Sequence, residues 1–315
     1  MRLQFSVFVI AMLTLAPATA ARAQQEQPAP PENVTLTTDD GVQLTITYYA
    51  STAGEEAPTV VMLPDYKGNR ATFAPLAQRL QSPEPDSGQP SFAVVTVDPR
   101  GHGDSTRQIF GDGSEAEIDA AKMKQNDFLA MVALDMKAVR RFLVTKNDEG
   151  DLNLNKLCLV GAGLGANVAA NWAAIDWSWP PLAVGKQGQD VKALVLVSPR
   201  WKDHGLSMQD VFRPGPFKNE FKQYVAWFLI FGAENDRVRY DCGRIFKQLE
   251  KYHPEAASAE PGHTTDLMQL GWATGLQGDA LLSQVGTPLY DHIVDFLVKN
   301  VAEQDFRWIS RRDRL

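Results

Sequence analysis

The sequence is poor in cysteine, in long apolar stretches and in positive charge. Its 315 residues contain two cysteines, too few for a disulfide framework, so we expect Cys158 and Cys242 to be free, packed thiols. No stretch is long enough to cross a bilayer comfortably as a helix, and no transmembrane segment is predicted. The formal net charge of −7 leaves no basic stripe, which argues against a nucleic-acid partner.

Metal and cofactor motifs are also missing. His204, His253 and His292 stand alone in the sequence, without the spacing that metal ligation requires. A glycine-rich phosphate-binding turn is an alternative interpretation of Gly161–Gly165. That turn lacks the lysine of a Walker loop, and Ala166 stands where the dinucleotide motif needs glycine. We therefore predict no metal site and no cofactor.

The first residues are typical of a secretory signal peptide. Arg2 supplies a positive charge, a short apolar run continues to Leu15, and small residues follow as far as Ala23. We expect cleavage after Ala23, with Ala20 as the other small-x-small site. The mature protein is then expected to be secreted or periplasmic. Residues 24–33, rich in glutamine and proline, are expected to form a disordered lead-in.

Alternating apolar patterns predict a hairpin followed by parallel strands. Residues 34–38 and 42–50 alternate around Asp39-Asp40-Gly41, which is a hairpin signal. Short apolar runs then alternate with helical stretches, as in βαβ units. The central strands are predicted at 59–63, 92–97, 156–160, 191–197 and 225–231, and two of the helices at 129–143 and 290–301.

A chain of this length can form a single domain. We place that domain at residues 34–303 and expect residues 304–315 to be a C-terminal tail. The tail carries several arginines and is interpreted as frayed and solvated. Aromatic residues gather at 172–179 and at 201–221. They indicate either packing at helix ends or an apolar pocket or partner patch, and the sequence leaves both open.

Four places along the chain, in a fixed order, carry a family resemblance. They are the loop after Leu63, the segment Asp98–Ser105 (DPRGHGDS), the turn Gly161–Gly165 (GAGLG), and the late segments Gly232–Asp236 and Gly262-His263. Together they resemble the α/β-hydrolase family, in particular its lipase, esterase and serine-aminopeptidase-like members, over roughly residues 34–301. The resemblance implies an α/β-hydrolase fold: a mostly parallel central sheet, helices on both faces and a short cap insertion at about residues 199–222.

Gly163 stands where this family has its nucleophile. There a strand, a Gly-x-Ser-x-Gly turn and a helix raise a serine hydroxyl above the sheet. The serine position has a positive φ, which costs a residue with a side chain about 1–3 kcal/mol and which glycine adopts freely. Ser198 follows the next strand and is expected to tie loops together. We therefore predict a hydrolase scaffold without its standard chemistry.

The resemblance also implies an acid and a base. Asp236 fits the acid, with Glu234 as the weaker candidate, and His263 fits the base. A carboxylate that accepts from one ring nitrogen would leave the other nitrogen free to take a proton. Structural roles within their own turn are implied for Asp98, Arg100 and His102.

The loop after Leu63 departs from the family pattern. Tyr66 and Leu164 are, by position, the candidate backbone N–H donors of an oxyanion hole. Pro64 lacks an N–H group, and Asp65 brings a charge. If that carboxylate points toward the pocket, it opposes an oxyanion by about 1–4 kcal/mol at a separation of about 4 Å. If it points to solvent, it costs little.

Two functions follow from these residues. The first is an exported, catalytically silent hydrolase-like protein that binds a small apolar ligand or a protein partner through the former pocket or its surface. The second is a slow hydrolase of an ester or amide, in which His263 and Asp236 activate a water molecule. The glycine at position 163 favours the first.

Overall fold

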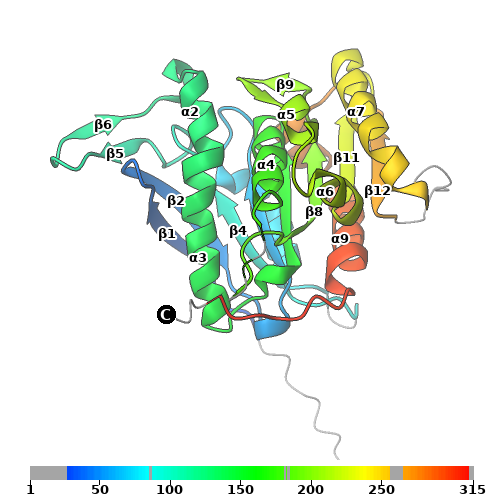
Figure 1. Ribbon diagram of the computed structural model, residues 1–315, viewed down its shortest axis with the longest axis horizontal. Coiled ribbons are helices and arrows are strands. Elements are labelled where there is room, and N and C mark those ends of the chain that lie inside the picture. The colour runs from blue at the N-terminus through cyan, green and yellow to red at the C-terminus, as the bar shows by residue number, and fades with distance from the viewer. Residues whose placement is uncertain (1–26, 85–86, 181, 183–184, 256–264, 312–315) are drawn as a thin grey trace, which may run out of the picture.

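A computed structural model describes residues 27–84, 87–180, 182, 185–255 and 265–311, so the predicted signal peptide lies outside the described residues. Ten strands form one sheet in the order β12-β11-β8-β7-β3-β4-β2-β5-β6, with β1 paired to β2 (Figure 1). These strands are β1 (Glu32–Thr37), β2 (Val42–Tyr49), β3 (Thr59–Leu63), β4 (Ala93–Val97), β5 (Arg107–Ile109), β6 (Glu115–Glu117), β7 (Leu157–Ala162), β8 (Val191–Val197), β11 (Ala226–Gly232) and β12 (Leu267–Trp272). A separate two-stranded sheet joins β9 (Lys202–Asp203) and β10 (Leu206–Ser207).

The central sheet is mostly parallel, which confirms the predicted fold class. From β12 to β4 each strand runs parallel to its neighbours. β2 pairs antiparallel with β1, β4 and β5. β3, β4, β7 and β11 are buried along their whole length, because helices cover both faces. The strands predicted at 59–63 and 191–197 match β3 and β8, and the predicted hairpin matches β1 and β2.

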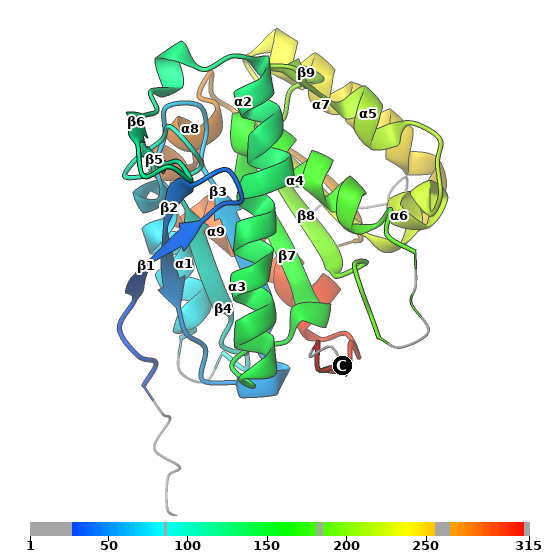
Figure 2. The same cartoon turned by 60° about the vertical axis from the view of Figure 1, so that its left-hand side comes forward.

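Helices pack on both faces of the sheet (Figure 2). Those that bury apolar side chains with one face are α2 (Gln125–Ala130), α3 (Met136–Asp148), α4 (Leu164–Asp176), α5 (Met208–Phe212), α6 (Lys218–Tyr224) and α7 (Asp236–Leu249). Those on the opposite face are α1 (Ala74–Gln81), α8 (Gly278–Val285) and α9 (Thr287–Leu297). The long helix predicted at 129–143 is α2 and α3 joined by a π-helical turn, Met131–Asp135.

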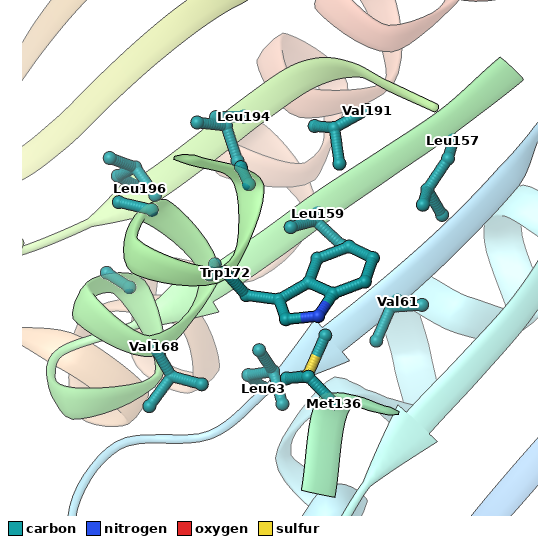
Figure 3. Packing of buried hydrophobic residues seen from close by; sticks show 14 of the residues in the cluster. Val61, Leu63, Met136, Leu157, Leu159, Val168, Trp172, Val191, Leu194 and Leu196 are labelled. Atoms are coloured by element: carbon teal, nitrogen blue, oxygen red, sulfur yellow. The ribbon is translucent and has the colours of Figure 1, made fainter. Parts of the chain in front are cut away.

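Alternation along the strands divides the core in two. In β3, Val61 and Leu63 face one apolar cluster, and Val60 and Met62 face the other, because successive strand residues point to opposite faces. On the first face the indole of Trp172, from α4, lies among side chains of β3, β7 and α3 (Figure 3). This packing fixes α4 against the sheet.

The strands β5, β6 and β12, at the edges of the sheet, were not predicted. β12 was missed because Gln269 and Gly271 interrupt its apolar pattern. As an edge strand β12 is only partly covered, and Leu267 is its one fully buried residue. The short pair β5 and β6 extends the opposite edge. The cap segment, residues 199–222, contains the β9–β10 hairpin, α5 and α6, and its apolar residues pack in the same core as α4.

The end of the chain is fastened to the body, and the expected frayed tail is wrong for residues 306–311. We call this segment the C-terminal arm. Asn153 and Asn155 donate from Nδ2 to the carbonyls of Phe306 and Arg307 over 2.9 and 2.6 Å. The indole N–H of Trp308 donates to the carbonyl of Asn147 over 3.2 Å. The guanidinium of Arg311 is buried. Arg312 and Arg314 lie outside the described residues.

Both cysteines are free and buried, as predicted. Burial raises the pKa of the Cys158 and Cys242 thiols far above the usual range. Packed, protonated thiols of this kind are chemically inert. In the part of the chain that the structure describes, no helix combines the length and the apolar character that crossing a bilayer requires.

Candidate functional site

β7, Gly163 and α4 form a sharp strand-turn-helix at the carboxyl end of the parallel strands. Gly163 has φ 49° and ψ −112°, in the left-handed half of the backbone map that glycine enters without steric cost. Its N–H donates to the carbonyl of Val197, at the end of β8, over 2.8 Å. α4 begins at the next residue, Leu164. This is the geometry that a nucleophile turn requires, without a side chain at its apex.

The Asp65 carboxylate points toward this turn and not to solvent. Its Oδ1 accepts from the Leu164 N–H over 2.9 Å and from the Tyr66 N–H over 2.6 Å. These are the two backbone donors predicted for an oxyanion hole. The carboxylate also lies at the N-terminus of the 13-residue helix α4, where the helix dipole stabilises a negative charge. The chain therefore satisfies both donors with its own side chain.

Two glycines provide the room that this carboxylate occupies. A Cβ added at Gly163 would overlap the carboxyl group of Asp65, and so would a Cβ added at Gly278, at the start of α8. Both glycines have positive φ, 49° and 52°. A serine at position 163 would thus have to displace the Asp65 carboxylate.

A second carboxylate lies directly behind the first. The Asp65 N–H donates to Asp279 Oδ1 over 2.9 Å, and the Thr72 hydroxyl donates to Asp279 Oδ2 over 3.2 Å. Burial raises the pKa of Asp279 to about 6, with the hydrogen bond from Asp65 opposing the rise and the Asp65 charge adding to it. The neighbourhood of the turn is therefore acidic.

The loop after β12 carries an amide where a base could meet the turn. Gln277 Oε1 accepts from the Ser198 hydroxyl over 2.7 Å, and Gln277 Nε2 donates to the Gly232 carbonyl over 2.9 Å. The Ser198 oxygen in turn accepts from the Gly278 N–H over 2.9 Å. The ends of β8, β11 and β12 are thus tied together by neutral groups. Residues 273–277 include no histidine.

The predicted acid and base are not brought together in the described residues. Asp236 begins α7 with its side chain 86% exposed and pairs with Arg239 over 2.5 Å. Glu234 lies just before it. His263 lies outside the described residues. The carbonyl of Asp266, three residues later, accepts a hydrogen bond from the Trp227 N–H over 2.7 Å.

This placement bears on the Asp236–His263 pair. Trp227 lies at the amino end of β11, and Asp236 lies beyond the carboxyl end of the same strand. The seven residues of β11 span about 20 Å. The chain therefore enters β12 at the amino end of the parallel strands, whereas Asp236 lies beyond their carboxyl end. Because His263 lies outside the described residues, the pair stays a prediction.

The DPRGHGDS segment forms a hydrogen-bonded turn. Asp98 is fully buried and accepts from the backbone N–H groups of Arg70 and Asp104 over 2.6 and 2.9 Å. Arg100 makes a bidentate contact with Asp40 and also binds Asp135, over 2.7 Å in both cases at the closest approach. The π-helical turn between α2 and α3 supplies Asp135. These contacts join the turn between β1 and β2, the loop after β4 and the π-helical turn.

His102 and His204 belong to an aromatic group beside the turn. His102 is 3% exposed, and its Nδ1 lies 2.9 Å from the Arg100 carbonyl. His204, at the tip of the β9–β10 hairpin, packs against the rings of Tyr66 and Phe128 with centroids 4.6 and 4.4 Å apart. From the sequence, His204 was predicted to be an isolated histidine without partners. The Asp203-His204-Gly205 triplet, a turn signal between two short strands, could have indicated the hairpin.

Known structures share this architecture. The esterase Pf2001 of Pyrococcus furiosus is 16% identical and superposes with a TM-score of 0.52 over 86% of this chain and 93% of its own. An esterase from Rhizomucor miehei, 16% identical, gives 0.53 over 88% and 84%. A 2,6-dihydroxy-pseudo-oxynicotine hydrolase, 12% identical, gives 0.54 over 91% and 72%.

Sequence comparison adds nothing to these structural similarities. No protein-family model matches the chain, and no curated protein matches it either. Identities of 12–16% establish architecture and leave activity open. The resemblance read from the sequence motifs is confirmed at that level. The chain therefore has the α/β-hydrolase fold.

Proposed function

We propose that this protein is an exported binding protein built on an α/β-hydrolase scaffold, without serine-hydrolase activity. One observation carries the proposal. The Asp65 carboxylate accepts from the N–H groups of both Tyr66 and Leu164 and fills the space above Gly163. The chain's own negative charge lies where acyl transfer would have to stabilise a developing oxyanion.

Two further features support loss of acyl transfer. Acyl transfer needs a nucleophile, a base and free oxyanion donors at one point. At this turn Gly163 supplies no nucleophile, and the Gln277 amide is occupied by its contacts with Ser198 and Gly232. In a serine protease the loss of the nucleophile alone costs about six orders of magnitude in rate.

Slow hydrolysis by a water activated by His263 and Asp236 is the competing proposal. It requires an imidazole at the carboxyl ends of the parallel strands, close to the Gly163 turn. The exposure of Asp236 and its pairing with Arg239 count against it. It is retained as an outcome of the test below.

Wild-type protein is expected to hydrolyse activated esters no faster than buffer does, and not to react with a fluorophosphonate probe. The measurement is the release of 4-nitrophenol from acyl chains of two to twelve carbons, together with mass spectrometry of the intact protein. Phosphonylation needs a reactive hydroxyl, and the Ser198 hydroxyl is bound to Gln277.

His263→Ala is the informative variant, and Asp236→Asn is its companion. Turnover in the wild type that both substitutions abolish would establish the water-activating hydrolase and overturn the silent scaffold. A rate unchanged by either substitution and equal to that of heat-denatured protein supports the proposal. His292→Ala is the matched control, because His292 packs against the Trp272 ring on the face of the sheet opposite to α4.

Export is the other part of the proposal, and the first 23 residues support it. Full-length protein made in an exporting bacterial host is expected to appear outside the cytoplasm with Gln24 as its first residue. Replacing both Ala21 and Ala23 by leucine removes the small side chains that signal peptidase needs. Precursor should then accumulate in the membrane fraction. Recovery of wild type in the cytoplasm with its N-terminus intact would contradict export.

A further inference from the structure

We propose that the tip of the β9–β10 hairpin closes a binding site for a small, planar aromatic ligand that carries an N–H or O–H group. The imidazole of His204 occupies that site in the structure as a surrogate for the ligand. The site rests on the proposed binding function, because it gives that function a location and a ligand chemistry. It adjoins the Asp65 carboxylate through Tyr66, which contributes to both.

Three distant parts of the chain bring aromatic rings to one point. Tyr66 follows β3, Phe128 belongs to α2, and His204 belongs to the cap. The His204 ring is tilted by 37° against Tyr66 and by 39° against Phe128, and the Tyr66 and Phe128 centroids are 6.2 Å apart. Such distances are those of favourable aromatic contacts. The site thus accepts a flat ring.

The hairpin holds His204 in an unfavourable backbone conformation. His204 has φ 46° and Gly205 has φ 92°, the left-handed pair of a two-residue hairpin turn. Glycine or asparagine fits the first of these positions at less cost than histidine does. A Cβ added at Gly205 would overlap the side chain of Gln125, at the start of α2. The cap hairpin therefore rests on α2, and His204 has a left-handed backbone conformation where it does so.

His102 supplies an unused hydrogen-bond acceptor beside these rings. Because Nδ1 faces the Arg100 carbonyl, it carries the proton in the neutral ring, and Nε2 keeps a lone pair. Nε2 is buried and has no hydrogen-bond partner among the described residues. Burial lowers the pKa of His102, against the opposing effects of the Arg100 carbonyl and of the Asp98 and Asp65 carboxylates, and this favours the neutral ring. The His102 and Tyr66 centroids are 5.9 Å apart.

A buried acceptor without a partner calls for a donor. An aromatic N–H or O–H group that enters beside Tyr66 would supply one. Charges of both signs border the site, with the Lys67 ammonium 5.3 Å from the Tyr66 centroid and the Asp203 carboxylate 2.9 Å from His204 Nδ1. A neutral ligand is therefore favoured over an ion.

Indole and 1-benzofuran are matched probes, because they have nearly the same shape and only indole carries an N–H. Indole is titrated into wild-type protein while the ring proton signals of His204 are followed by NMR. Binding should shift these signals toward their exposed values, because His204 leaves the ring currents of Tyr66 and Phe128. Benzofuran should bind about five-fold more weakly, the effect of one missing hydrogen bond.

His204→Gly removes both the competing ring and the strained side chain. We expect indole to bind this variant about ten-fold more tightly than wild type. In wild type part of the binding free energy is used to displace the His204 ring, and this variant has no ring to displace. Phe128→Leu, which keeps an apolar side chain but loses the ring, should weaken indole binding in both backgrounds. Its fold is checked by thermal unfolding, and His292→Gly is the control for histidine removal.

Two results would overturn the site. One is the absence of any His204 shift in wild type at millimolar indole. The other is binding to His204→Gly alone, which would mark an artificial cavity. Ester hydrolysis is measured on the same samples. Ester turnover in the wild type would contradict the proposed function whether or not indole binds. Absence of indole binding without any turnover would contradict this site alone.

Discussion

Replacing Gly163 by serine is expected to destabilise the protein by about 4 to 6 kcal/mol. A side chain at a strained positive φ costs about 1–3 kcal/mol. The new Cβ would also expel the Asp65 carboxylate from the N–H groups of Tyr66 and Leu164, and hydrogen bonds to a charged group contribute about 1.5–3 kcal/mol each when buried. Asp65 is half-buried, so we take the lower part of that range. Equilibrium unfolding in urea measures the loss.

Asp65→Gly provides the second arm of a double-mutant cycle. In that background no carboxylate remains to be expelled, so the effect of Gly163→Ser should shrink to the backbone strain alone. Gly243→Ser is the control, because nothing lies near its Cβ position in α7 and its φ is ordinary. Equal effects of Gly163→Ser with and without Asp65 would show that the carboxylate does not occupy the turn. An unchanged unfolding midpoint for Gly163→Ser alone would show the same.

Asp190→Ala is expected to destabilise the protein by about 3 to 5 kcal/mol, the usual effect of leaving a buried cation unpaired. Asp190 is fully buried and lies 2.6 Å from Arg311, 3.1 Å from Lys186 and 3.3 Å from Arg140. The Arg311 side chain is only 2% exposed and would lose its carboxylate. The free energy of unfolding, from urea or guanidinium titration, tests the expectation.

Arg311→Ala is expected to cost less than Asp190→Ala, because Asp190 keeps Arg140 and Lys186 as partners. Combining the two substitutions should give a loss smaller than the sum of the single ones. Arg307→Ala is the matched control. That side chain is 86% exposed and pairs with the exposed Asp305 at 4.0 Å, so its removal should change stability by less than about 0.5 kcal/mol. Equal losses for Arg307→Ala and Arg311→Ala would contradict a docked arm.

The parallel sheet could be predicted because its strands are apolar on both faces. Runs such as 59–63 and 191–197 are bounded by polar loops and separated by helical patterns, so their positions follow from the sequence. β12 could not be read in the same way. Gln269 and Gly271 interrupt its apolar residues, and Leu267 is its one fully buried residue. The strand is held at the edge by backbone pairing with β11, which leaves no trace in composition.

At the candidate site, backbone positions were easier to predict than side-chain directions. The spacing of glycines around position 163 indicates a turn with positive φ, and the structure has it. Whether Asp65 faces the turn or solvent depends on the space beside Gly163 and Gly278. Gly278 is 115 residues further along the chain from Gly163, and no local pattern connects the two. The same applies to His204, which meets Tyr66 and Phe128 only after the cap has folded.

The docked C-terminal arm has a consequence for the order of folding events. Its contacts join residues that are far apart in the sequence: Arg311 meets Asp190, and the carbonyls of Phe306 and Arg307 meet Asn153 and Asn155. Contacts of such long sequence separation require a large loop to close first, which makes them slow to form. Until the arm docks, the carboxylate of Asp190 lacks its nearest cation, so a folding intermediate without the arm is less stable than the native state.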